Sequence, residues 1–161
     1  MKTTVLLCLM IMGFTFESYP CECNRLMWAE WKAEDVKESM EFNDVIFTAE
    51  LVSVKKDYYE FKVLKVFKGK LKEQEIVKGF HITSCSGWPQ KQRTGRWIFY
   101  GQYEQDEKGE KVLNYSQCGP TRSLNHPPIY TKEQNANYWK SELEMLNKRF
   151  HKNIELKLNT D

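Results

Sequence analysis

The chain has 161 residues, a formal net charge of +2 and 14% aromatic residues. This length suits a single domain that buries a hydrophobic core of its own. The near-neutral charge offers no electrostatic attraction to a polyanion, so we expect no nucleic-acid partner.

The N-terminus has the pattern of a secretion signal. Lys2 precedes an uncharged, mostly apolar stretch from Val5 to Phe16. The stretch is shorter than the about 20 residues that a membrane-spanning helix needs, but it is typical of a signal peptide. We therefore expect residues 1–20 to be a signal, with no membrane span. The remainder would be secreted and lie in an extracellular, cell-surface or periplasmic location.

The mature N-terminus has three alternatives, which are a cut directly before Cys21, a cut after Ser18, and a lipid attached to Cys21. Signal peptidases prefer small residues before the cut, whereas Pro20 precedes Cys21. A cut after Ser18 would instead leave Tyr19 and Pro20 on the mature chain. A lipid anchor on Cys21 is the third alternative, although the small residue expected directly before a lipidated cysteine is missing.

The cysteines predict a disulfide-bonded protein. The chain has five, of which Cys8 leaves with the signal. An even set outside the cytosol favours two disulfides among Cys21, Cys23, Cys85 and Cys118. The spacing lacks the paired Cys-x2-Cys units of zinc sites and the Cys-x-x-Cys of thioredoxin-like proteins. We therefore expect no metal and no cofactor.

The rest of the chain predicts a mainly β protein with two helices. After a helix within residues 26–40, strands are expected at 45–54, 58–67, 75–83, 95–101 and 111–115. Five strands can close a small barrel, which removes exposed sheet edges. Thr131 is a candidate N-cap for a C-terminal helix that ends at Phe150. This helix should dock on the barrel through an apolar stripe of Trp139, Leu143, Leu146 and Phe150.

Nothing in the sequence indicates an enzyme. The three histidines, His81, His126 and His151, are scattered and fit no metal-ligand spacing, and His81 falls inside an expected strand. No nucleophile elbow or phosphate-binding loop is present. Disulfide use of the cysteines would also leave no thiol nucleophile.

Five segments together resemble a known family. They are Cys21-Glu22-Cys23, Asn43 to Glu50, Phe61 to Gly69, Ser84-Cys85 and Ser116 to Arg122. Their order resembles the N-terminal domain of the tissue inhibitors of metalloproteinases, an OB-type Greek-key barrel of the netrin-module superfamily. The similarity is greatest to short, single-domain, bacterial-type members. It covers residues 21–124, leaving residues 125–161 as a C-terminal helix and tail.

The resemblance implies specific roles at the mature N-terminus. It pairs Cys21 with Cys85 and Cys23 with Cys118. Each bridge would close a long loop and could contribute roughly 4 kcal/mol to stability. In the family, the amine and carbonyl of the first cysteine bind the catalytic zinc of a protease, and the next side chain enters the specificity pocket. Those roles would fall to Cys21 and Glu22, with Glu22 replacing a small hydroxyl residue.

The predicted function is therefore a secreted, monomeric inhibitor of an extracellular zinc metalloprotease. Its protease-binding residues would be Cys21, Glu22 and Cys23, and the metal would belong to the target. The alternative is a non-inhibitory, extracytoplasmic, netrin-like binding module whose disulfides are purely structural.

Overall fold

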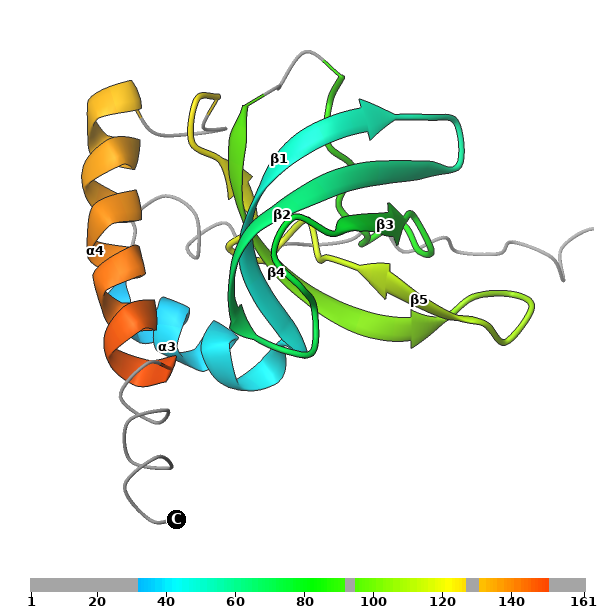
Figure 1. Ribbon diagram of the computed structural model, residues 1–161, viewed down its shortest axis with the longest axis horizontal. Coiled ribbons are helices and arrows are strands. Elements are labelled where there is room, and N and C mark those ends of the chain that lie inside the picture. The colour runs from blue at the N-terminus through cyan, green and yellow to red at the C-terminus, as the bar shows by residue number, and fades with distance from the viewer. Residues whose placement is uncertain (1–31, 92–94, 127–130, 151–161) are drawn as a thin grey trace, which may run out of the picture.

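Five strands form a closed barrel in the computed structural model, which describes residues 32–91, 95–126 and 131–150 (Figure 1). The sheet order is β1-β2-β3-β5-β4, and pairing of β1 with β4 closes it. β3 and β5 pair in parallel, and the other neighbours are antiparallel. The barrel is of the OB type. Its strands are β1 (Val45–Val54), β2 (Tyr58–Lys68), β3 (Ile76–Phe80), β4 (Arg96–Gln105) and β5 (Lys111–Asn114).

The structure corrects the bounds of two predicted strands and adds a strand that was not predicted. β3 ends at Phe80 because Phe80 pairs with Tyr58, the first residue of β2, so His81 lies just outside the strand. β4 continues past Gly101 to Gln105 because its second half pairs with β5. A short strand that the sequence did not predict, β6 (Arg122–Ser123), pairs with the start of β4.

β1 is buried on both of its faces at its start. Phe47 and Ala49 belong to the core inside the barrel, whereas Ile46 belongs to a second core outside it. β4 follows the same rule, with Phe99 inside and Ile98 outside. Successive side chains of a strand point to opposite faces. This two-sided burial explains why both strands are continuous apolar runs in the sequence.

The interior core is dominated by aromatic rings. Phe99 stacks on Phe47 with 4.7 Å between ring centroids, and it meets Phe61 edge-on at 5.4 Å. Tyr115 approaches Phe99 in the same edge-on manner at 5.3 Å. These offset and edge-to-face geometries are the favourable ones for aromatic pairs.

Two helices cover one side of the barrel, α3 (Ala33–Phe42) and α4 (Lys132–Phe150) (Figure 1). α3 overlaps the predicted N-terminal helix, whose first residues lie outside the described ranges. The predicted α4 stripe is confirmed, because all four of its apolar residues pack in the outer core. The predicted N-cap is also confirmed. The Gln134 backbone N–H donates to Thr131 Oγ1 (3.2 Å), and the Thr131 N–H donates to Gln134 Oε1 (3.0 Å).

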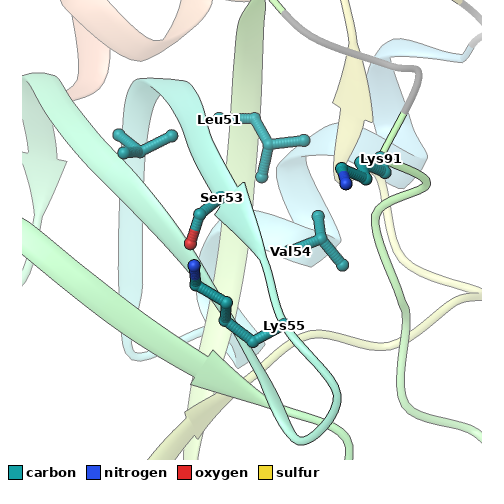
Figure 2. A pocket seen from close by; sticks show the side chains of 6 residues that line it. Leu51, Ser53, Val54, Lys55 and Lys91 are labelled. Carbon is teal, nitrogen blue, oxygen red and sulfur yellow. The ribbon is translucent and has the colours of Figure 1, made fainter.

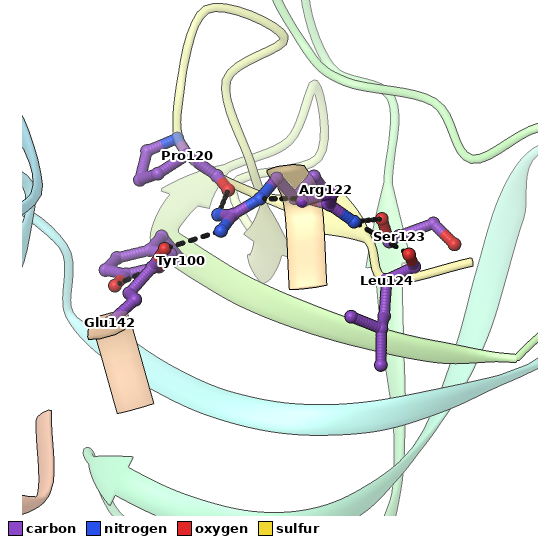
Figure 3. Close-up of polar contacts among 7 residues, drawn as sticks. Tyr100, Pro120, Arg122, Ser123, Leu124 and Glu142 are labelled. Carbon is purple, nitrogen blue, oxygen red and sulfur yellow. Dashed lines mark hydrogen bonds and ion pairs between the residues drawn. The ribbon is translucent and has the colours of Figure 1, made fainter. Parts of the chain in front are cut away.

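A buried polar network fixes α4 to the barrel (Figure 3). The Arg122 guanidinium donates to Glu142 Oε2 at 2.7 Å, and the Tyr100 hydroxyl donates to Glu142 Oε1 at 2.6 Å. Arg122 also donates to Asn135 Oδ1 (3.0 Å), and the Asn135 amide donates to the carbonyl oxygens of Ser123 and Leu124. The network therefore connects β4, β6 and α4 through the buried side chains of Tyr100, Arg122, Asn135 and Glu142.

The stability of the fold should fall at alkaline pH. Burial, and then the neighbouring Tyr115, raise the pKa of Tyr59 above its ordinary value of 10.0. The unfolded chain therefore loses this proton near pH 10 while the folded chain keeps it, so stability present below pH 10 is lost as the pH rises. Tyr59→Phe should reduce this loss by about 1.4 kcal/mol per pH unit. Urea unfolding between pH 8 and 11 measures how the free energy of unfolding changes with pH. Equal slopes for the unsubstituted protein and Tyr59→Phe would contradict the prediction.

The same substitution should not weaken the protein at neutral pH. The Tyr59 hydroxyl is buried and has no hydrogen-bond partner among the described residues. Removing it therefore costs no hydrogen bond and relieves the desolvation of a polar group.

Candidate functional site

The predicted protease-binding residues Cys21, Glu22 and Cys23 lie outside the described residues. Their expected disulfide partners, Cys85 and Cys118, are described. Both are half-buried and both are disulfide-bonded. Cys85 lies in the loop after β3 and Cys118 in the loop after β5. The pairings Cys21–Cys85 and Cys23–Cys118 stay predictions.

The two cysteine-bearing loops lie side by side. The Gln117 backbone N–H donates to the Cys85 carbonyl at 2.9 Å, and the Gln117 side-chain amide donates to the Ser84 carbonyl at 3.1 Å. Ser86 and Ser116 form an antiparallel β-bridge. We call residues 83–87 and 115–119 together the cysteine platform.

Side-chain hydroxyls shape each loop of the cysteine platform. Ser86 Oγ accepts hydrogen bonds from the backbone N–H groups of Ile82 (3.1 Å) and Thr83 (2.9 Å). In the second loop, Ser116 Oγ accepts from the Cys118 N–H at 3.1 Å. Serine hydroxyls commonly hold turns in this way.

Gly87 joins the cysteine platform to the barrel core. Its N–H donates to the Tyr115 carbonyl at 2.6 Å. A Cβ atom at Gly87 would overlap the Tyr115 ring, which itself packs against Phe99. Only glycine allows the two segments to approach this closely.

A cavity of about 290 Å³ adjoins the platform. Its aromatic wall contains Trp88, Trp97 and Tyr115, and His81 meets Trp88 edge-on at 5.9 Å. Arg122 also lines it, but this guanidinium is already paired with Glu142. The polar lining is therefore largely committed to internal hydrogen bonds.

A second cavity of about 240 Å³ lies beside the end of β1 (Figure 2). Leu51 and Val54 point to the side of the strand that carries Lys91, whereas Ser53 and Lys55 lie on the other side. The Ser53 hydroxyl donates to Glu60 Oε2 at 2.7 Å. Because the two lysines do not converge, the cavity is not arranged as an anion site.

The described ranges hold no cluster of metal ligands and no helix that could span a membrane. No group of three or more His, Cys, Asp or Glu side chains there is placed to hold a metal ion. No helix in those ranges is long and apolar enough to cross a membrane. His81 lies at the first cavity, and the backbone N–H of His126 donates to Ser123 Oγ. His151 falls outside the described residues.

No protein-family model matches the chain, and a search of curated proteins finds no match. The cysteine platform holds Cys85 and Cys118, the two disulfide-bonded cysteines of the described ranges.

Sequence reasoning missed the contacts that build the platform. Cys85 and Cys118 were candidates from their residue type alone, whereas the role of Gln117 depends on the loop after β3. The Gly87 contact likewise depends on a ring from another strand end. Gly87, directly after Cys85-Ser86, was the one sign in the sequence of a close contact. A lone glycine does not show which distant side chain packs against it.

Proposed function

We propose that the exported chain inhibits a zinc metalloprotease, with the α-amino nitrogen and carbonyl oxygen of Cys21 as ligands to the zinc of the protease. The observation that supports this proposal is that Cys85 and Cys118, each of which is disulfide-bonded, lie on adjoining loops of the barrel. Disulfides from them to Cys21 and Cys23 would hold the mature N-terminus at one place.

The chemistry of a terminal cysteine suits this role. An α-amino group has a pKa near about 8, so a fraction is neutral at pH 7 and able to bind zinc. A terminus held by two bridges loses little conformational entropy when it binds, which favours affinity. The platform contributes to this through the hydrogen bonds that fix both cysteine-bearing loops.

Glu22 narrows the class of protease that the protein could inhibit, because its carboxylate would enter the specificity pocket. Burying its carboxylate without a partner would cost several kcal/mol. A specificity pocket that contains a cationic side chain, or that stays open to water, would accept Glu22 at a lower cost. We therefore propose a target whose pocket next to the zinc is polar or basic.

The decisive experiment compares two N-termini. The mature protein and a version with one alanine added before Cys21 are assayed against a panel of zinc proteases. The extension blocks the amine but leaves the barrel unchanged, so the inhibition constant should rise at least about 100-fold, as when a dominant contact is lost. Intact-mass analysis of the secreted protein establishes which residue is first.

Three results would contradict the proposal. Equal inhibition by both proteins would exclude chelation by the amine. A mature chain that starts at Tyr19, or that carries lipid on Cys21, would have no free Cys21 amine. A chain that starts at Cys21 but inhibits none of the proteases would favour the non-inhibitory binding module.

A further inference from the structure

The cavity beside the cysteine platform has a wall of three aromatic rings that the barrel core holds in place. Trp97 meets Phe61 edge-on with 5.5 Å between ring centroids, and Trp88 meets Tyr59 in the same manner at 5.5 Å. Tyr115 also approaches Tyr59 edge-on, at 5.7 Å. Rings that core contacts already fix lose little side-chain freedom when a ligand binds. The wall is therefore preformed, as is usual for small-molecule sites.

The polar groups of the cavity favour an uncharged ligand that accepts a hydrogen bond. Arg122 lines the cavity, but its guanidinium is committed to Glu142 and to neutral oxygens, so it offers an anion no free counter-charge (Figure 3). Ser123 also lines the cavity and is 1% exposed. Its Oγ accepts from the His126 N–H at 3.2 Å, and its hydroxyl proton has no acceptor among the described residues. Because a hydroxyl can donate as well as accept, this proton is available to a ligand oxygen.

The volume of the cavity sets the size of the ligand. An apolar cavity of about 150 Å³ accommodates one benzene ring. The cavity beside the cysteine platform has a volume of about 290 Å³, which gives room for two fused rings. Rings of a ligand can lie offset from or edge-on to the indoles, and such aromatic pairs gain more than the buried area alone provides.

We propose that this cavity binds a small, uncharged, bicyclic aromatic molecule that carries one hydrogen-bond acceptor. Trp88 and Trp97 are the ring-binding side chains, and Ser123 is the donor. Ser86 and Gly87 of the cysteine platform also line the cavity, so a bound ligand would contact the platform as well. Binding at this site does not depend on inhibition of a protease, so the proposed function can fail while the ligand site holds.

The test titrates the exported chain with naphthamide, which has two fused rings and an uncharged carbonyl acceptor, and follows it by ¹H–¹⁵N NMR. The indole N–H signals of Trp88 and Trp97 and the backbone amides of Gly87 and Ser123 should shift together, with one submillimolar dissociation constant. Trp139 provides the internal control. Its ring belongs to the outer core beneath α4, so its indole N–H signal should stay in place.

Two matched probes separate the contribution of the rings from that of the charge. Decalin carboxamide keeps the amide but has saturated rings, so it should bind about 5-fold more weakly than naphthamide. Naphthoate keeps the aromatic rings but carries a carboxylate. Because Arg122 is already paired with Glu142, that carboxylate would lose water without gaining a free counter-charge from Arg122. Naphthoate should therefore bind at least about 10-fold more weakly than naphthamide.

Three substitutions test the named side chains, and a dispersed amide spectrum shows that each variant is folded. Trp88→Ala removes a half-buried ring of the wall and should weaken naphthamide binding about 10-fold, whereas Trp88→Phe should recover part of the affinity. Ser123→Ala removes the donor and should weaken binding about 5-fold. Ser53→Ala is the control, because the Ser53 hydroxyl bonds Glu60 and does not line this cavity. It should leave the dissociation constant unchanged.

Four results would overturn the site. They are unchanged Trp88 and Trp97 signals up to the solubility limit of naphthamide, a shift of the Trp139 signal as large as theirs, undiminished affinity in Trp88→Ala, and tighter binding of naphthoate than of naphthamide. Protease assays on the same preparations report separately on the proposed function.

Discussion

Glu142→Ala should lower the free energy of unfolding by about 3–5 kcal/mol. The substitution leaves the Arg122 guanidinium, whose side chain is 3% exposed, without the carboxylate 2.7 Å away. It also removes the acceptor of the Tyr100 hydroxyl. The Arg122 charge would keep only its hydrogen bonds to neutral oxygens and would be buried without a counter-charge, and the Tyr100 hydroxyl would be buried without this acceptor. Both changes are costly because the groups stay desolvated. Urea denaturation followed by tryptophan fluorescence measures the change.

The exposed ion pair between Arg149 and Glu41 provides the matched control. Its side chains are 45% and 63% exposed, and its atoms are 3.3 Å apart. Glu41→Ala should therefore cost at most about 1 kcal/mol. Replacing both buried partners, as Arg122→Met with Glu142→Leu, should recover part of the lost stability. Similar losses for Glu142→Ala and Glu41→Ala would contradict the role of the network.

Phe99→Ala should cost about 3–5 kcal/mol through a cavity in the middle of the barrel. Phe99 is fully buried and contacts the rings of Phe47, Phe61 and Tyr115. The surrounding strands are closed into a barrel, so they can collapse only partly into the space. Chemical denaturation with an unchanged m-value would show that stability, and not the two-state character, has changed.

Phe42→Ala is the control for this substitution. Phe42 lies at the end of α3 with 67% of its surface exposed, so its loss should change stability by no more than about 0.5 kcal/mol. A large loss for Phe42→Ala, or a small one for Phe99→Ala, would show that the barrel interior is not the main core.

The boundaries of β1 and the stripe of α4 were predictable because they depend on local patterns. β1 is a run of β-branched and aromatic residues that ends at a charged turn, and its observed bounds match the prediction. The apolar spacing in α4 fixes which face packs, and the Thr131 cap fixes where the helix begins. Neither needs information from a distant part of the chain.

The end of β3 was not predictable in the same way. Residues 81–83 are as compatible with a strand as those before them, but β2 offers no partner beyond Tyr58. β6 is too short for any periodicity and exists because β4 has an open edge beside it. Strand ends of this kind are decided by the partner strand.

The sequence alone determined the five barrel strands and the docking stripe of α4, because composition and periodicity are properties of neighbouring residues. Only the tertiary structure decided that Cys85 and Cys118 stand on adjoining loops and that Arg122 meets Glu142 in the interior. These contacts join residues far apart in the chain. Which residues meet depends on how the barrel closes and where α4 docks, and no local sequence pattern contains that information.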